Sequence, residues 1–524
     1  MLGTNARRPA AQRDTATPAI DEPEIKARVR EILNRHPCVG LAVGVVRDGQ
    51  LAFFDAHGLA SVASQKPVTE DTVFRVASIS KTFTAIALMQ LYEQGLVDLD
   101  APANDYLRAF QLVPAKPGWP PATVRHLLTH TAGLPEMVHV SRALGYAFGE
   151  SYRLDETVPT LGEYYGCHGL PVVSEPGTTF RYTDHSFSAL SQVVEDVSGQ
   201  PFADYLREHI FEPLDMADTD IVRTARVESR LASGYAYGSR GPKPVADRQW
   251  VTAGASMIYS TPGDMARYVA ALLGGGGNDH GRVLGPATMA LMFEPHYQTH
   301  PLIPGIGLAF DRYKVGGCDI VGHEGVLPGF NSEIMFAPGE GVGVMAFTNG
   351  ASGAMLWLPH ECSRLLSLVL GQPDDTIRTD LPQHPEIWSG ICGWYKLSAR
   401  LTDMRLRAFL GLGVEVFVRG DKLMLRGLNL LPALYRGFVL RPDDDNDPYV
   451  FRVDASAFGM GTARIVFSRD GEGAMRVHPD VMPLTLTKQP DSTNPRVWAG
   501  RALVLAAIAL TLRGVTRSGR RRVA

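Results

Sequence analysis

One stretch of this chain joins a β-like apolar segment to a long apolar helix, and it runs Val73-Phe74-Arg75-Val76-Ala77-Ser78-Ile79-Ser80-Lys81-Thr82-Phe83. Ser78 and Lys81 stand three positions apart at the junction, and such positions share one face of a helix. A lysine in an apolar pocket has its pKa lowered by desolvation and can then accept or relay a proton. The helix N-terminus favours negative charge on an activated serine. The pair therefore predicts a nucleophile, Ser78, and its proton partner, Lys81.

This spacing alone occurs often by chance, so two further segments decide its meaning. One is Pro-Gly-Thr-Thr-Phe-Arg-Tyr-Thr-Asp at residues 176–184, and the other is Gly-His-Glu-Gly-Val-Leu-Pro-Gly-Phe-Asn at residues 322–331. A tyrosine beside a cationic lysine can act as a base, and a carboxylate can hold that lysine in place. A glycine-containing strand edge can offer a backbone N–H to an oxyanion. Together with Ser78, these segments indicate nucleophilic catalysis.

Composition excludes several classes of function. The chain has 524 residues, which suggests two or three domains, and a net charge of -4. No basic stripe interleaved with aromatic residues is present, so a nucleic-acid binder is not expected. The five cysteines are far apart and form no C-x-x-C pair, which argues against disulfides and a zinc site. We expect reduced thiols, a cytoplasmic protein, and no metal or cofactor.

The two histidines His126 and His130 stand four positions apart on a possible helix. No glutamate follows His126 as a zinc-binding H-E-x-x-H helix would require. We therefore expect both histidines to be structural.

The order of elements predicts the fold class of the main domain. A hairpin is expected over 39–54, with Asp48-Gly49 as its turn. Helices are expected over 78–94, 186–198, 202–210 and from Thr261 onward, followed by strands over 319–321, 332–336 and 342–347 and a closing helix over 358–370. Early strands, a helical middle and late strands predict an α/β (α+β) sandwich, in which an antiparallel sheet is flanked by helices and joined by an all-helical subdomain.

Composition shifts along the chain set the expected domain boundaries. Residues 1–25 are predicted to be disordered and lack the apolar core of a signal peptide. The main domain covers 26–372, and a linker rich in proline and aspartate covers 373–388. Short strands with turn signals then predict a small β-barrel or β-sandwich, and we expect a lipocalin-like barrel over 389–490. The sequence leaves open whether this barrel caps the active site or mediates dimer contacts.

The last segment, residues 491–524, combines an apolar run at 502–512 with a basic tail. The run is too short to span a bilayer as a helix. It is either a terminal helix that packs on the body or a segment that lies in a membrane surface.

Over residues 28–370 the chain resembles the serine β-lactamase and penicillin-binding-protein superfamily, in particular its class C-like branch of esterases, D-amino-acid peptidases and related serine hydrolases. The motifs that carry this resemblance are Ser78-x-x-Lys81, Leu127 to Pro135, Pro176 to Tyr182, Phe202 to Met216, Gly322 to Gly325 and Pro328 to Phe330. The resemblance implies that Ser78 is the nucleophile, Lys81 its proton partner and Tyr182 the general base. It also implies an oxyanion hole formed by the backbone N–H groups of Ser78 and Val326.

The resemblance further implies that Asp184, His323 and Gly325 contact the substrate, with His323 at the position of the lysine in the K-T-G triad. Two residues depart from the family pattern. Asp184 stands where asparagine is usual, and its charge should raise the pKa of Lys81. Glu324 replaces a small residue, and a second acid should disfavour a substrate carboxylate. Because β-lactams and D-Ala-D-Ala peptides carry one, the departures favour a neutral ester or amide.

The resulting functional hypothesis is a serine hydrolase that works through an acyl-enzyme, with carboxylesterase activity on small neutral esters or amides. The alternatives within this class are a D-aminopeptidase or DD-peptidase, which would act on D-amino-acid peptides, and a β-lactamase. A further alternative is a catalytically weak homologue that serves as a binding or scaffold module. A homo-oligomer and peripheral membrane contact through the C-terminal tail are compatible with each.

Overall fold

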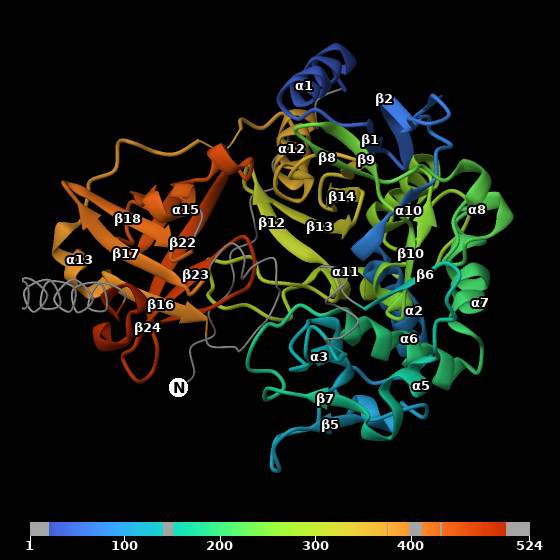
Figure 1. Cartoon of the computed structure of the whole chain (residues 1–524), viewed down its shortest axis with the longest axis horizontal. Coiled ribbons are helices and arrows are strands. Elements are labelled where there is room, and N and C mark those ends of the chain that lie inside the picture. The colour runs from blue at the N-terminus through green and yellow to red at the C-terminus, as the bar shows by residue number, and fades with distance from the viewer. Residues whose placement is uncertain (1–19, 140–149, 375, 398–410, 430–431, 499–524) are drawn as a thin grey trace, which may run out of the picture.

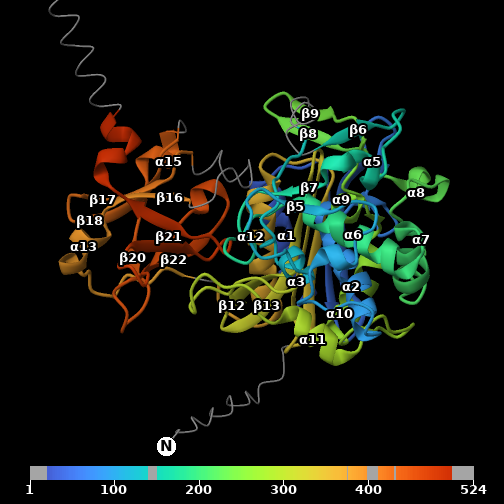
Figure 2. The same ribbon diagram turned by 90° about the horizontal axis from the view of Figure 1, so that it is seen from below.

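The protein forms a larger α/β lobe with a smaller β-barrel lobe beside it in a computed structural model, which describes residues 20–139, 150–374, 376–397, 411–429 and 432–498 (Figure 1). Turning the molecule by 90° keeps the two lobes distinct (Figure 2). The barrel lobe contains the orange and red end of the chain.

A seven-stranded antiparallel sheet forms the centre of the larger lobe, in the order β12-β13-β14-β15-β1-β2-β3. Its strands are β1 (Gly40–Arg47), β2 (Gln50–Ser61), β3 (Lys66–Pro67), β12 (Asp311–Val315), β13 (Cys318–Leu327), β14 (Phe330–Ala337) and β15 (Val342–Thr348). β1 pairs with β15, so the early and late segments share one sheet, as predicted. Asp48 and Gly49 both have positive φ values, 51° and 77°, which confirms the hairpin turn.

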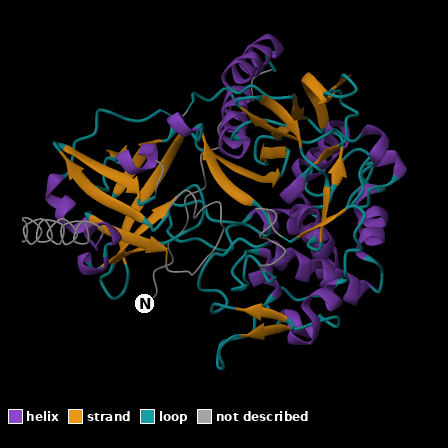
Figure 3. Ribbon diagram, viewed as in Figure 1, coloured by secondary structure: helices purple, strands orange, loops and turns teal. Residues whose placement is uncertain are grey.

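Helices cover both faces of this sheet (Figure 3). On one face, α1 (Glu22–Arg35) and α12 (Ala354–Val369) share an apolar core with alternate side chains of the sheet. The other face packs against α10 (Pro262–Leu273) and belongs to the larger core of the lobe. α1 begins at Glu22, so the last residues of the segment predicted to be disordered are helical.

The all-helical part of this lobe is built around α2 (Ser80–Glu93), which packs against α6 (Asp184–Ser198). Every residue of α2 from Ser80 to Leu91 is buried, which fits its apolar sequence on all sides. Thr183 and Thr261 cap α6 and α10 with their side chains, as expected for N-cap threonines.

The remaining elements of the larger lobe are short. They are β4 (Phe74–Arg75), η1 (Ala77–Ile79), η2 (Ala103–Asp105), β5 (Leu112–Pro114), α3 (Val124–Leu128), β6 (Ser151–Arg153), α5 (Leu161–Tyr165), η3 (Gly166–His168), β7 (Leu170–Val172), α7 (Phe202–Leu206), the π-helix η4 (Arg207–Phe211), α8 (Ala225–Arg230), β8 (Tyr235–Gly238), β9 (Gly241–Pro244), β10 (Arg248–Trp250), α9 (Ala253–Ser256), β11 (Tyr259–Ser260) and α11 (Pro286–Phe293).

The smaller lobe is a nine-stranded, nearly closed antiparallel barrel in the order β19-β18-β17-β16-β24-β23-β22-β21-β20. Its elements are α13 (Pro385–Ile391), β16 (Gly393–Leu397), β17 (Val414–Arg419), β18 (Lys422–Gly427), α15 (Pro432–Arg436), β19 (Phe438–Val439), β20 (Arg441–Pro442), β21 (Val450–Asp454), η5 (Ser456–Phe458), β22 (Thr462–Arg469), β23 (Met475–Pro479), β24 (Leu486–Gln489) and η6 (Asp491–Thr493). Side chains fill its interior, among them the fully buried Tyr395.

The five cysteines are all free thiols. Among the described residues, no helix is both long and apolar enough to cross a membrane, and no cluster of three or more His, Cys, Asp or Glu side chains is placed to hold a metal ion. The apolar run and basic tail at 499–524 lie outside the described residues, as do residues 1–19.

Candidate active site

Ser78 lies in a tight turn between β4 and the central helix α2. The turn is the 3-10 helix η1, so the α-helix predicted from Ser78 begins two residues later, at Ser80. Ala77 has a φ of 52°, a left-handed value that residues with a Cβ rarely adopt. Backbone strain of this kind concentrates at functional sites, because the surrounding structure must maintain it. The side chain predicted to be the nucleophile therefore follows a strained residue directly.

The Lys81 side chain is fully buried beneath Ser78, and oxygen atoms surround its Nζ. Its Nζ lies 3.0 Å from Ser78 Oγ, 2.7 Å from Asp184 Oδ1 and 3.1 Å from the carbonyl oxygen of Ala255. An ammonium group carries three N–H donors and no acceptor. These three contacts therefore match the charged form of Lys81.

The pKa of Lys81 follows from competing effects. Burial lowers this pKa, as the sequence analysis expected, but the net shift is upward. The Asp184 carboxylate opposes burial most strongly, and Tyr182 adds to it through its charge and a hydrogen bond. The expectation of a lowered lysine pKa is therefore wrong, whereas the direction expected from Asp184 agrees with the structure. Lys81 carries its proton at neutral pH.

Tyr182 reaches the same group from the segment before α6. Lys81 Nζ lies 4.9 Å from the centroid of the Tyr182 ring, where the aromatic face attracts a cation. Thr183 is the N-cap of α6 and Asp184 its first residue, a position at which the helix dipole favours a carboxylate. The fold thus brings four side chains together: Ser78 from the turn η1, Lys81 from α2, Tyr182 from the loop before α6 and Asp184 from α6 itself.

His130, which the sequence analysis treated as structural, holds both chain neighbours of Tyr182. Its carbonyl oxygen accepts the N–H of Arg181 at 2.7 Å, and its Nδ1 accepts the N–H of Thr183 at 3.3 Å. The His130 and Tyr182 ring centroids are 4.4 Å apart. Burial, reinforced by the charge of Lys81, places the pKa of His130 well below its ordinary value. The imidazole is therefore neutral at neutral pH, as an accepting Nδ1 requires.

The sequence carried one signal for this role. His130 lies within the segment Leu127 to Pro135 that supports the family resemblance. Its φ of 56° is a second sign, but only the structure reveals it.

The C-terminal part of β13 packs against the turn that holds Ser78. A Cβ atom on Gly325 would lie 2.1 Å from Ser332 Oγ and 2.2 Å from the carbonyl oxygen of Val76, so only glycine fits without displacement. Ser332 Oγ donates a hydrogen bond to the same Val76 carbonyl at 2.8 Å. Gly325 thus permits a close approach of the sheet, and Val326 follows it on this strand.

β12 leaves this part of β13 uncovered. It pairs with β13 only from Cys318 to Gly322, and β14 is the strand that pairs with residues from His323 onward in the described structure. His323 is buried, and its Nδ1 lies 2.6 Å from the carbonyl oxygen of Glu324. Because a carbonyl only accepts, Nδ1 carries a proton. His323 also contributes to the lowered pKa of His130, so the His323 ring lies within electrostatic reach of the His130 ring beside Tyr182.

Glu324 does not point toward this group. Successive side chains on a strand alternate between faces, and Glu324 pairs with Glu333 on the face that α12 covers. There it raises the pKa values of the half-buried Asp311 and Tyr313 and of the buried Glu333, in each case as a smaller effect than desolvation. The argument that Glu324 repels a substrate carboxylate is therefore wrong, because its charge acts on the opposite face of the sheet.

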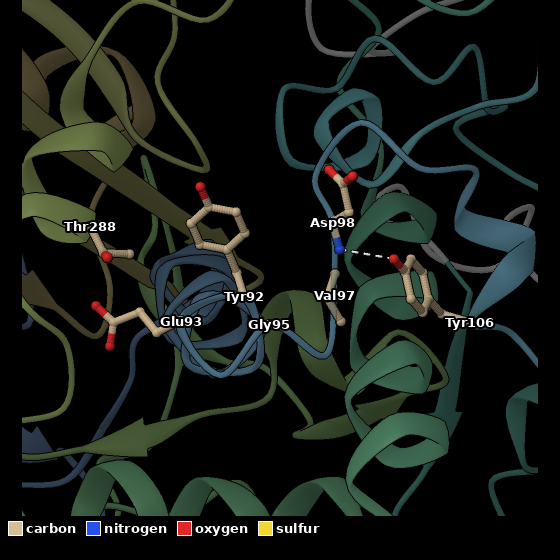
Figure 4. Close-up of a pocket in the computed structure, with 7 residues that line it drawn as sticks. All are labelled: Tyr92, Glu93, Gly95, Val97, Asp98, Tyr106 and Thr288. Atoms are coloured by element: carbon tan, nitrogen blue, oxygen red, sulfur yellow. Dashed lines mark hydrogen bonds between the residues drawn. The ribbon is translucent and has the colours of Figure 1, made fainter.

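A separate hollow lies at the other end of α2. It is lined by Tyr92, Glu93, Gly95, Val97, Asp98, Tyr106 and Thr288 (Figure 4). Because a helix rises about 1.5 Å per residue, this end lies roughly 20 Å from Ser78. The hollow therefore belongs to a different part of the surface from the Ser78 group.

The model of the beta-lactamase family matches residues 25–358, well over half of the chain. The protein therefore belongs to the beta-lactamase family, which the SxxK pair and the arrangement around it had indicated.

The relatives of this chain are named as different kinds of enzyme. The esterase EstB of Burkholderia gladioli is 32% identical over 254 residues, 46% of this chain and 62% of that protein. A D-aminopeptidase of Gluconobacter oxydans is 28% identical over 68% of this chain and 63% of its own. The matches thus span somewhat less than two thirds of the length of these relatives. A solved octameric penicillin-binding protein homologue from Pyrococcus abyssi is similar in fold, with a TM-score of 0.58, 24% identity, and coverage of 90% of this chain and all of that one.

Proposed function

We propose that the protein is a serine hydrolase in which Ser78 forms an acyl-enzyme, and that its substrates are small neutral esters or amides. The observation that supports this most is the convergence of Ser78, Asp184 and Ala255 on one buried ammonium group at 2.7–3.1 Å. Chance placement of serine and lysine at this spacing would not bury a cation against a hydroxyl and a carboxylate. The relatives include proteins named as an esterase and a D-aminopeptidase.

The base in this proposal is Tyr182 rather than Lys81. Lys81 Nζ donates to Ser78 Oγ as an ammonium group, which has no lone pair to accept the serine proton. The charge of Lys81 favours the phenolate form of Tyr182, which then removes the proton of Ser78. The Lys81 ammonium holds the hydroxyl, and Asp184 holds the ammonium.

The reaction then follows two balanced steps. Ser78 Oγ attacks the substrate carbonyl carbon, and the N–H groups of Ser78 and Val326 stabilise the oxyanion. The bond to the leaving group breaks, and Tyr182 returns the proton to that group. In the second step Tyr182 takes a proton from water, and the resulting hydroxide attacks the acyl carbon. The bond to Ser78 breaks, and Tyr182 returns the proton to Ser78 Oγ, which restores the starting state.

The preference for a neutral substrate rests on His323. Its buried ring, fixed through Nδ1 to its own strand, replaces the lysine that the resemblance places at this position. An imidazole suits a hydrogen bond to a neutral carbonyl or hydroxyl group, whereas a carboxylate substrate would gain more from the full charge of lysine.

A substrate panel tests the proposal. We expect the wild-type protein to hydrolyse p-nitrophenyl esters and Ser78→Ala to lose this activity. Tyr182→Phe, which keeps the ring against Lys81, should lower kcat/KM by about 10²- to 10⁴-fold. D-amino-acid amides and nitrocefin in the same panel separate peptidase and β-lactamase activity. If Ser78→Ala retained wild-type turnover, the proposal would be refuted.

A further inference from the structure

The barrel lobe contacts the larger lobe beside Tyr182 through the loop between β23 and β24. Leu484 of this loop is buried in one apolar cluster with Phe180 and Ile306 of the larger lobe. Met482 of the same loop and Tyr182 are partly buried and pack against that cluster. The loop between β23 and β24 therefore lies beside Tyr182, although about 300 residues separate them in the sequence.

The composition of this loop is unusual for a connection between two antiparallel strands. Its residues 481–484 are Val-Met-Pro-Leu, whereas such turns ordinarily use Gly, Asn, Asp or Ser. The N–H of Leu484 donates to the carbonyl oxygen of Met482 at 2.7 Å, which closes a tight turn around the proline. Val481 has 52% of its surface exposed next to this turn. An apolar loop tip thus extends from the anchor at Leu484.

Contacts within the barrel lobe fix the base of this loop. The N–H of Arg464 donates to Asp480 Oδ1 at 2.9 Å, and the N–H of Asp480 donates back to the Arg464 carbonyl at 3.1 Å. On the other side, Thr485 Oγ1 lies 3.3 Å from Nδ1 of His478. The loop is therefore held at both ends.

Two further contacts between the lobes set the position of the barrel. Ile303 of the larger lobe forms a buried apolar cluster with Val450 and Val466 of the barrel. At another point the backbone of Gly461 approaches the ring of His360 on α12 so closely that a Cβ would lie 2.3 Å from it. Together with Leu484, these contacts hold the loop beside Tyr182.

We propose that residues 481–484 form an apolar wall of the substrate site, which favours esters or amides with an apolar group on the scissile carbonyl. This inference rests on the function proposed above and specifies its substrate class. Removing one methylene of the substrate from water contributes about fourfold in binding. A wall that contacts several methylenes therefore discriminates between short and longer acyl groups.

The test compares kcat/KM for p-nitrophenyl hexanoate and acetate. We expect Met482→Ala to lower the hexanoate-to-acetate ratio by about fourfold or more, and Val481→Ala to lower it in the same direction. Met482→Leu, which preserves the volume, should retain most of the wild-type ratio and controls for misfolding. Val418→Ala is the matched control, because Val418 is a 44% exposed valine on β17 of the same lobe. Val418→Ala should leave kcat/KM unchanged for both p-nitrophenyl hexanoate and p-nitrophenyl acetate.

A hexanoate-to-acetate ratio that stays at the wild-type value in both Met482→Ala and Val481→Ala overturns the inference. Reaction of the wild-type protein with a fluorophosphonate distinguishes this failure from that of the proposed function. If Ser78 is labelled and p-nitrophenyl acetate is hydrolysed, but the hexanoate-to-acetate ratio is the same in the variants as in the wild type, only the apolar wall is refuted. If Ser78 is neither labelled nor required, the proposed function and the wall fail together.

Discussion

At the scale of single residues, charge and hydrogen bonding assign different tasks to two candidate bases. Lys81 is fully buried, yet the net shift of its pKa is upward. The Asp184 carboxylate and Tyr182 both raise this pKa, and together they outweigh the lowering by desolvation. A permanent ammonium under Ser78 orients the hydroxyl but cannot accept its proton. In the proposed mechanism the proton transfer therefore depends on Tyr182, and Lys81 controls it through its charge.

Asp184→Asn tests the role of this charge through the pH profile. Asp184 raises the pKa of Lys81, so removing its charge lowers that pKa. Lys81 then loses its proton at a lower pH, and we expect the alkaline limb of kcat/KM to move to lower pH. The measurement is kcat/KM for p-nitrophenyl acetate between neutral and alkaline pH. An alkaline limb that stays in place or moves upward contradicts the assignment.

His130 provides a second test at this scale. We expect His130→Gly to lower kcat by about tenfold or more, because the ring and its Nδ1 no longer position Tyr182. His130→Asn should retain more activity, since asparagine tolerates the left-handed backbone and keeps an acceptor for the Thr183 N–H. The measurements are kcat, KM and the melting temperature of each variant. Equal losses of kcat in both variants, in step with their melting temperatures, would indicate a purely structural histidine.

At the scale of elements, local signals predicted much of the fold. The hairpin at Asp48-Gly49 and the helices α6 and α10 were predictable because their turn and cap residues determine backbone geometry directly. The start of α2 was not, because the 3-10 turn at Ala77 depends on contacts with distant strands. The face of Glu324 could not be assigned either, since it depends on the register of β13 and β14.

Gly325→Ala tests whether the approach of β13 to the Ser78 turn is required. A Cβ here meets Ser332 Oγ and the Val76 carbonyl at 2.1 and 2.2 Å, so β13 must move away. We expect a loss of kcat/KM of at least about tenfold and a lower melting temperature. Gly339→Ala is the control, because no atom lies within 4 Å of its Cβ position. Normal activity of Gly325→Ala would contradict this packing.

The acidic side chains on the opposite face of the sheet predict a pH-dependent stability. Neither carboxylate oxygen of Glu333 has a hydrogen-bond partner, and burial raises its pKa well above the ordinary value. Burial and the charge of Glu324 raise the pKa of Asp311 to about 7. The folded state therefore binds more protons than the unfolded state above the ordinary carboxyl pKa values. The contribution of these two groups to the free energy of unfolding therefore falls as pH rises from about 4 toward 7 and beyond.

Glu333→Gln removes one of these groups. We expect the free energy of unfolding of this variant to exceed that of the wild type by a larger margin at pH 8 than at pH 5. Urea denaturation at both pH values measures the difference. A relative stability that is equal at both pH values would show that Glu333 does not change its protonation on unfolding.

At the scale of the whole molecule, the barrel lobe adjoins the Ser78 group. The sequence predicted a small β-barrel after the main domain but left its role open between capping and dimer contacts. Contacts among Phe180, Ile306 and Leu484 join segments more than 100 residues apart, and no periodicity or turn signal encodes such pairs. The role of His130 was unpredictable for the same reason, because its hydrogen bonds connect the segment after α3 to the loop before α6.

The most direct test of the account is the mass of the protein after brief reaction with a p-nitrophenyl ester. Acid quenching followed by peptide mapping locates any acyl group. The account predicts one acyl group per chain, attached to the peptide that contains Ser78, and none on Ser78→Ala. Rapid ester hydrolysis with the acyl group on another residue, or undiminished turnover by Ser78→Ala, would contradict it.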